Sequence, residues 1–439
     1  MDSITDTVTA PYGQPLSQAE RLLQLTTPQG QELFALRAHA QERLSQVPRY
    51  TVDVINQTPA FDPEQLIGQA VQLSIKLDDG TLSPRHGWVE SVRYLGSDGG
   101  LDDWQLVFAP WFSLLEYRVD CRIWQEVNLP DILAQVFQRY SQARGAYRFD
   151  LSRDYPLLSY VTQFNESDAH FVQRWCEQEG LFWYVEHQVD SHCIVFTDSV
   201  LFLPTLNPPT LRFHTQQAAA QQDSITQWSP GTRLLNGVVQ SSSNDYFCHA
   251  RSQVAQALAL PAASAPADLE RYQYRGQYAW QNLDRGDWLS RVQIEQDESA
   301  ARRIHGQGGV RQMQPGHGFE LTQHPLYELK KRKDRQFLII AVEFFAQSNL
   351  PVGTQRINPP GSLRALFETG QGKSMLAAGG EGIYQNRFET QRLDMAYRSP
   401  FAHAKPANPG PQTAVVVTPS GREVFTDNLN RICVRFHWD

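Results

Sequence analysis

Cysteine is scarce in this sequence: the 439 residues include only five, and these lie far apart. A chain of this length buries enough apolar surface to fold without disulfides. Because the number is also odd, we expect free thiols in a protein that folds in a reducing cytoplasm. The five residues are Cys121, Cys176, Cys193, Cys248 and Cys433.

Long apolar runs are also missing. No segment approaches the roughly 18 apolar residues that a membrane-spanning helix needs. Residues 1–14 lack both the basic and the apolar region of a cleavable signal peptide. We therefore expect no stable membrane insertion, and we expect that any export uses machinery that reads something other than such a signal.

Positive charge is not in excess, since 39 Lys and Arg residues face 47 Asp and Glu residues, for a formal net charge of -8. This balance gives no overall electrostatic reason to bind nucleic acid or an anionic membrane. Hydrophobic residues are 41% and charged residues 20%, which is ordinary for a globular protein and excludes a disordered chain. The length predicts about two to four domains.

Complete nucleotide-binding motifs are absent. Residues 372–374 (Gly-Lys-Ser) resemble the end of a phosphate-binding loop, but that pattern requires glycine where Phe367 stands. Gly379 also follows too soon for the helix that such a loop needs. The glycines of residues 305–309 lack the spacing and the preceding strand of a dinucleotide-binding loop, so we interpret them as the end of a helix.

Metal-ligating and acidic residues form no recognisable site, and C-x-x-C, H-E-x-x-H and G-x-S-x-G patterns are absent. Histidine and cysteine are adjacent at 192–193 and 248–249, but neighbours in a strand point to opposite faces. Glu177 and Glu179 face different ways on a predicted helix, and residues 102–103 (Asp-Asp) fall in a predicted solvated turn. The sequence therefore predicts no catalytic, cofactor-binding or metal-binding residue, and a protein that is not an enzyme.

The run Lys330–Arg335 is the one dense basic segment. It could be a short nucleic-acid contact. On an acidic protein we favour a solvated loop between two strands, because charge runs commonly solvate turns.

Alternating apolar residues predict strands in the first part of the chain. Val71, Leu73, Ile75 and Leu77 share one face, and the following Asp-Asp-Gly predicts a hairpin turn. Further strands are predicted at 88–95 and 104–111. Together they predict a meander over about 30–112 that closes as a barrel or packs on a neighbour. Residues 1–29, by contrast, are expected to form a loosely held arm.

Helical patterns follow. Pro130 and Asp131 precede a helix at about 132–140, and Ser167 is a good N-cap for a second helix that ends at Gly180. Residues 181–187 and 193–198 then predict a hairpin. The block from 113 to 205 is therefore expected to be a small α+β unit.

The remainder returns to β patterns. Short strands are expected over 206–260, one long helix near 281–305, and further strands at 319–322 and 337–347. The proline-rich residues 400–411 predict a linker, after which alternating residues predict the opening strands of another β domain. Because about 28 residues cannot complete a domain, we expect the sequence to be a fragment that stops in mid-strand.

Several strings, in combination and in order, resemble the VgrG family of bacterial type VI secretion spike proteins, which is similar to the hub and spike proteins of contractile phage tails. The resemblance covers about residues 30–439. Asn430 departs from the family's glycine, residues 361–380 have no counterpart, and the family's β-helical needle is missing. The matching strings are Arg122–Gln125, Pro130–Ile132, Tyr160–Asp168, Phe171-Val172, Glu177–Tyr184, Pro315–Phe319, Tyr384–Phe388, Gly410–Ala414 and Arg431–Asp439.

The resemblance implies a mainly β fold with an α+β insert, of the phage tail-hub kind, with two β-barrel tube domains and the start of an OB-fold at the C-terminus. The domains that it implies are an N-terminal arm (1–29), a first β-barrel tube domain (30–112), an α+β domain (113–205), a second β-barrel tube domain (206–399) with a helical insertion near 281–305, a linker (400–410) and the opening strands of a truncated OB-fold (411–439).

The resemblance also implies a function. The chain is expected to be a structural homotrimer that docks on the Hcp tube protein, contacts baseplate proteins and carries a PAAR-type tip protein or effectors through a target envelope. It would assemble in the bacterial cytoplasm and be secreted without a signal peptide. Two alternatives stay open: the baseplate hub of a prophage contractile tail, or a hub with a cell-wall hydrolase in a missing C-terminal extension.

Overall fold

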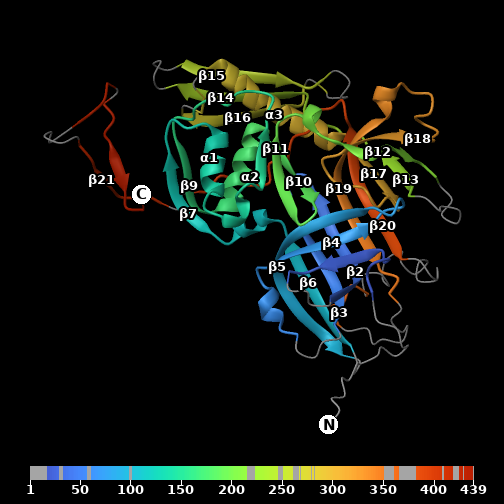
Figure 1. Ribbon diagram of the computed structural model, residues 1–439. Coiled ribbons are helices and arrows are strands. Elements are labelled where there is room, and N and C mark those ends of the chain that lie inside the picture. Colours follow the sequence, from blue (N-terminus) through green and yellow to red (C-terminus); the bar gives the residue numbers. More distant parts are fainter. Residues whose placement is uncertain are drawn as a thin grey trace, which may run out of the picture.

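Strands dominate the described residues of the computed structural model, and the helices lie among its smaller sheets (Figure 1). This agrees with the mainly β fold that the sequence predicts. Residues 248–249 and 369–374, which the sequence analysis considered, lie outside the described residues. The described residues are 17–28, 33–56, 61–97, 101–214, 223–245, 251–260, 266, 268–277, 279–280, 282–350, 360–364, 382–407, 410–418, 425–428 and 430–438.

The first part of the chain forms antiparallel strands in the order β1-β4-β5-β6-β3-β2. As predicted, β4 buries its apolar face, and Gly80, at a φ of 83°, lies in the turn to β5. Asp102 and Asp103 begin β6 instead of a turn, because they pair with the end of β3. The bounds are β1 (Leu23–Thr26), β2 (Leu33–Arg43), β3 (Gln46–Asn56), β4 (Ala70–Lys76), β5 (Leu82–Ser97) and β6 (Asp102–Ala109).

One side chain closes this ring of strands between β1 and β2. The Gln18 amide accepts hydrogen bonds from the N–H groups of Leu25 and Ala35 and donates one to the carbonyl of Leu33. β1 also pairs with β4, and its leucines are buried. The prediction of a loose arm is therefore wrong for Leu23–Thr26, whose apolar residues join the core.

A second ring of strands continues the same sheet. β19 pairs with β2 on one side and with β20 on the other, and the sheet runs on to β17 and β13. A bridge between Phe213 and Ile225 leads to β12, which pairs with β18 and so returns to β19. The two predicted barrel domains thus share one hydrogen-bonded sheet. The bounds are β12 (Thr205–Arg212), β13 (Ile225–Pro230), β17 (Ile304–Gly308), β18 (Gly318–Thr322), β19 (Gln336–Gln347) and β20 (Ile383–Arg392).

Residues 305–309 lie in and just after β17, so the prediction that they end a helix is wrong. A Cβ atom on Gly306 would lie 2.2 Å from Cζ of Phe388, and one on Gly308 would lie 2.4 Å from the carbonyl oxygen of Ser224. Glycine is needed here because neighbouring strands and rings approach closely.

The two helices and the hairpin predicted between residues 113 and 205 are present. The Ser167 hydroxyl accepts the N–H of His170 at 3.1 Å, which caps α2, and Gly180 ends this helix at a φ of 79°. Both helices pack their apolar faces around Phe112 and Trp183. The bounds are β7 (Val119–Trp124), α1 (Leu129–Phe137), β8 (Tyr147–Asp150), β9 (Val161–Ser167), α2 (Asp168–Glu179), β10 (Phe182–Gln188) and β11 (Ser191–Thr197).

A further small unit lies between β13 and β17. The sheet β15-β14-β16 packs against α3, and Ala255 and Leu289 contribute to the core between them. The predicted long helix exists, but it ends at Ala301 because β17 begins three residues later. The bounds are β14 (Val238–Asp245), β15 (Arg251–Leu258), β16 (Glu270–Gln277) and α3 (Leu283–Ala301).

The C-terminal residues form a hairpin that stands apart from the body in Figure 1. Its strands, β21 (Ala414–Val416) and β22 (Val434–Phe436), pair with each other where the sequence predicts opening strands. Trp438 contacts the body through Phe164, with ring centroids 5.4 Å apart. Short 3-10 helices are η1 (Pro63–Leu66), η2 (Trp111–Glu116), η3 (Ser141–Ala143), η4 (Val200–Phe202) and η8 (Arg332–Arg335).

Candidate functional site

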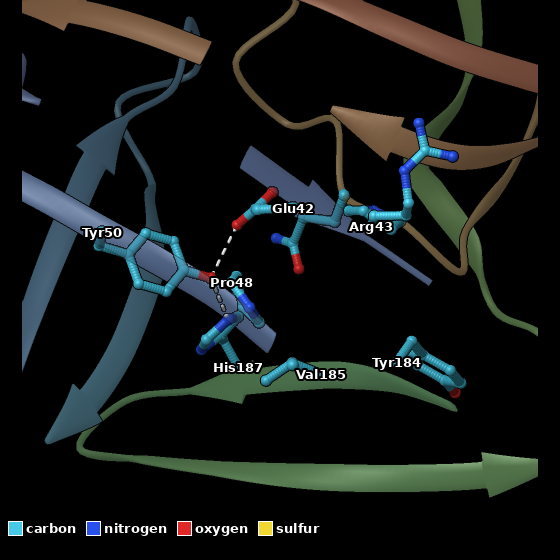
Figure 2. A pocket seen from close by; sticks show the side chains of 9 residues that line it. Glu42, Arg43, Pro48, Tyr50, Tyr184, Val185 and His187 are labelled. Atoms are coloured by element: carbon cyan, nitrogen blue, oxygen red, sulfur yellow. Dashed lines mark hydrogen bonds between the residues drawn. The ribbon is translucent and has the colours of Figure 1, made fainter. Parts of the chain in front are cut away.

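A buried polar junction joins the two rings of strands to the α+β unit. Arg85 of β5 is fully buried, and its Nε donates to Oε1 of Glu42 in β2 at 2.5 Å. Arg85 Nη2 also donates to the carbonyl of Met313, which precedes β18. The Tyr50 hydroxyl donates to the same Glu42 oxygen at 2.9 Å (Figure 2). The buried charge is tolerated because it is paired and hydrogen-bonded.

Three histidines extend this junction, and backbone donors fix their tautomers. His187 Nδ1 accepts the N–H of His86 at 3.1 Å, so its Nε2 carries the proton and donates to the Tyr50 oxygen at 3.0 Å (Figure 2). His192 Nε2 accepts the N–H of Trp111 at 3.0 Å, so its Nδ1 donates to His86 Nδ1 at 2.7 Å. All three rings are therefore neutral in the folded protein.

Burial accounts for the electrostatics of the junction. It lowers the pKa of His192 to about 3, with a smaller contribution from His86. It also lowers the pKa of His86, and it lowers the pKa of His187 well below its usual value, with Arg85 adding to the effect. Burial and then Glu42 raise the pKa of Tyr50. Each shift favours the neutral form that the hydrogen bonds require.

The junction encloses little free space. The cavity beside Glu42, Tyr50 and His187 measures about 20 Å³, which is room for one water molecule and no larger ligand. Across the described ranges, no group of three His, Cys, Asp or Glu residues is placed to hold a metal ion. The arrangement holds β2, β3, β5, β10 and β11 together through directed hydrogen bonds.

A groove of about 300 Å³ lies where residues 153–160 and α2 meet the start of α3. Three tryptophans line it, and the Arg153 guanidinium lies 3.6 Å from the ring centroid of Trp288. The buried carboxylate of Glu179 accepts hydrogen bonds from Arg285 and so ties the end of α2 to α3. The lining tryptophans are Trp175, Trp280 and Trp288.

The start of the predicted linker is anchored to α2. The carboxylate of Glu177 accepts the N–H groups of Ala402 and His403, each at 3.0 Å, and lies 2.7 Å from His403 Nδ1. Arg398 donates to the carbonyl of Gly180 and to Glu295 of α3. The sequence predicts that Glu177 and Glu179 do not form an acid–base pair. In the structure Glu177 binds residues 402–403, whereas Glu179 binds Arg285 of α3.

The structure brings together few of the residues that the sequence singled out. His192 enters the junction, while Cys193 points to the other side of β11, toward Tyr184 and Val195. Arg85, Glu42, His86 and His187 were not predicted, because nothing local marks them. The run Lys330–Arg335 does connect β18 to β19, as predicted.

The helices of the described part are all too short or too polar to cross a membrane.

Comparison with known proteins identifies the family. The sequence matches the phage tail baseplate hub (GPD) family over residues 41–350. The type VI secretion system spike protein VgrG1b of Pseudomonas aeruginosa is 30% identical over 97% of this chain and 53% of its own length. VgrG1a of the same species is 30% identical over 96% of this chain and 61% of its own length. The chain thus spans about half the length of the curated relatives it matches.

Solved structures show the same fold. An E. coli component of the type VI secretion system, described as similar to the T4 phage tail proteins gp27 and gp5, superposes with a TM-score of 0.61 at 17% identity, covering 91% of this chain and 87% of that one. A chain of the Francisella PdpA–VgrG complex superposes with a TM-score of 0.53 at 10% identity, covering 96% of this chain and 65% of that one. Because the family match covers most of the first ring of strands, the α+β unit and much of the second ring, the chain belongs to the phage tail baseplate hub family, and its relatives VgrG1b and VgrG1a are type VI secretion spike proteins.

Proposed function

We propose that this chain is the hub of a type VI secretion spike. In this role it forms a homotrimer, docks on the Hcp tube protein, contacts the baseplate and carries a PAAR-type tip protein or effectors. The two rings of strands act as β-barrel tube domains, and the C-terminal hairpin begins an OB-fold. The work is mechanical, so the chain has no catalytic, cofactor or metal residues.

The family match over 41–350 carries this proposal, because it spans the elements that the junction locks together. A hub that transmits force needs a body whose parts do not move apart. The Arg85–Glu42 pair and the Glu177 and Glu179 contacts meet this need by joining units that are distant in sequence. Like the spike proteins it resembles, the hub would assemble in the cytoplasm and then be secreted.

The test is secretion by the bacterium that encodes this chain. Deleting the gene should abolish release of Hcp into the medium, and the intact gene should restore it. Release that is unchanged by the deletion, in a strain with no second spike gene, would contradict the proposal.

Trimer formation is tested on the purified chain. Much of the contact in the related spikes is expected to come from regions beyond the hub, so we expect association only at high concentration. Sedimentation equilibrium over a wide concentration range should fit a monomer–trimer scheme. A stable dimer would count against the spike-hub assignment.

The second candidate is the baseplate hub of a prophage tail, which the family name itself favours. Affinity purification from the native host separates the two functions. Recovery of Hcp supports the secretion spike, whereas recovery of a phage tail tube protein supports the prophage hub. Turnover of peptidoglycan, nucleotides or peptides that a point mutation abolishes would contradict the non-enzymatic role.

A further inference from the structure

Residues 397–403 lie between β20 and the C-terminal hairpin, and are here named the strap. Its first three residues are buried: Tyr397, Arg398 and Ser399 are 2%, 6% and 3% exposed. The Tyr397 ring packs edge-on against Phe182 of β10, with ring centroids 5.0 Å apart. Connecting segments usually run over the surface of a protein. The strap differs, because its start is part of the core of the body.

Hydrogen bonds from the strap reach three separate parts of the body. Arg398 Nη1 donates to the carbonyl of Asp198, which follows β11, at 2.6 Å. The Ser399 carbonyl accepts a hydrogen bond from Nε2 of Gln296 in α3 at 2.6 Å. The Ser399 hydroxyl donates to the hydroxyl of Ser45, between β2 and β3, at 2.7 Å. The strap therefore joins the α+β unit, α3 and the first ring of strands at one place.

The strap ends against Glu177 of α2, whose side chain is buried. One carboxylate oxygen accepts the N–H groups of both Ala402 and His403, and the other lies 2.7 Å from the His403 ring nitrogen. The His403 ring also contacts the ring of His170, with centroids 5.2 Å apart. Hydrogen bonds to an ionised carboxylate are about twice as strong as neutral ones. Because the two N–H groups belong to successive residues, this anchor fixes the direction of the backbone as well as its position.

The sequence beyond the strap favours a stiff connection. Residues 404–411 include three prolines. Proline-rich linkers behave as semi-rigid spacers, because each ring fixes φ. The hairpin that follows contacts the body again through Trp438 and Phe164. A direction set at residues 402–403 is therefore carried to β21.

We propose that Glu177 positions the C-terminal part of the chain on the hub, because it fixes the direction in which the backbone leaves the body. This inference rests on the proposed spike role, in which the hairpin begins the next domain. A spike transmits thrust along its axis only if successive domains stay aligned. Glu177 acts through residues 402–403 and is a positioning residue, so its loss frees the hairpin and leaves the body folded.

The test measures the distance between the hairpin and the body by double electron–electron resonance on the purified chain. One spin label is placed on Cys433, which is exposed in the hairpin. The other is placed on Ser141→Cys, at an exposed position of η3. To keep the labelling specific, serine replaces three other cysteines: Cys121, Cys193 and Cys248.

Glu177→Ala removes both acceptor oxygens and should widen the distance distribution about twofold or more, because the linker can then swivel at residues 402–403. Glu177→Gln keeps an acceptor for the two N–H groups and should restore most of the wild-type width. His403→Pro removes one N–H group from the side of the strap, without touching α2, and should also widen the distribution.

The matched control is Glu298→Ala. Glu298 is likewise a buried glutamate on a helix, and its carboxylate accepts the backbone N–H of Leu260 at 2.5 Å. Its loss frees a segment other than the strap and should leave the distance distribution as narrow as in the wild type. Unchanged far-UV circular dichroism shows that the body of each variant remains folded.

Two outcomes would overturn the proposal. If Glu177→Ala and His403→Pro leave the distribution at its wild-type width, the anchor does not set the direction of the hairpin. If Glu298→Ala widens it as much as Glu177→Ala, the effect is a general loosening of the body. Neither outcome bears on the spike role, which release of Hcp tests separately. Conversely, unchanged Hcp release after gene deletion would remove the spike role and leave the anchor as measured.

Discussion

The Glu42–Arg85 junction and the C-terminal hairpin are opposite cases within one chain. In the junction, charged and titratable side chains are buried and partnered within the chain. In the hairpin, Val415, Val416 and Ile432 are each more than half exposed, at 56%, 53% and 53%. A two-stranded hairpin is marginal in water by itself. The comparison teaches that the body is stabilised from within, whereas the hairpin carries apolar surface that only further contacts can bury.

The largest effect is expected from breaking the buried pair. Arg85→Met leaves the Glu42 carboxylate buried without its cation and should cost about 3–5 kcal/mol of unfolding free energy, measured by urea denaturation. The double variant Arg85→Met/Glu42→Leu removes both charges and should recover at least half of that loss. If the unfolding free energy of Arg85→Met lies within about 1 kcal/mol of the wild-type value, the Arg85–Glu42 pair does not stabilise the junction.

Thiol labelling compares the body, at α2, with the hairpin. Cys176 is 1% exposed in α2, and burial raises the pKa of its thiol, whereas Cys433 is exposed beside β22. Cys433 should react about a hundredfold faster with a thiol reagent in the native state, which corresponds to about 2.8 kcal/mol of protection at Cys176. Fast labelling of Cys176 in the folded protein would place its helix face on the surface.

Acid should weaken the junction. His192 has a folded pKa of about 3 and an unfolded value near 6.5, so the unfolded state binds more protons between these values. Its stabilisation is complete above about pH 6.5 and falls by about 1.4 kcal/mol per pH unit below it. The difference in unfolding free energy between the wild type and His192→Gln should therefore shrink by about 1.4 kcal/mol for each pH unit below about 6.5. A constant gap from pH 7 to pH 5 would mean that His192 is not buried as a neutral ring.

The smallest effect on stability is expected in the hairpin. Val416 and Val434 are paired across the two strands, and both are exposed. The double variant Val416→Ser/Val434→Ser should therefore change the free energy of unfolding by less than about 0.5 kcal/mol. The same change at fully buried Val54 should cost about 1.5–3 kcal/mol. Weaker self-association of the hairpin variant, at unchanged stability, would show that this surface contributes to assembly.

Local patterns in the sequence predicted the elements well, because their causes lie within a few residues. Ser167 and Gly180 bound α2 through contacts to their own helix, and the Asp-Gly turn at 79–80 needs only a positive φ. The family resemblance supplied the hub fold. Two local predictions were wrong because contacts distant in sequence decide the structure there. Asp102 and Asp103 form a strand because they pair with β3, and residue 306 is glycine in a strand because the ring of Phe388 leaves no room for a side chain.

The junction could not be predicted in the same way. His86 and His192 are 106 positions apart, in β5 and β11. From the sequence alone, Arg85 could face either solvent or the core of the strand layer. Only the packing of β5 against β10 and β11 decides that these polar side chains face each other.

The pairing of β19 with both β2 and β20 has a mechanical consequence. Hydrogen bonds between antiparallel strands lie perpendicular to the strands, so a force directed along them loads every bond in shear at once. Between β2 and β19, the pairs from Ala341–Arg43 to Gln347–Arg37 would have to fail together and could not open one by one. A force applied along these strands to one ring would therefore pass to the other through the hydrogen bonds of the shared sheet.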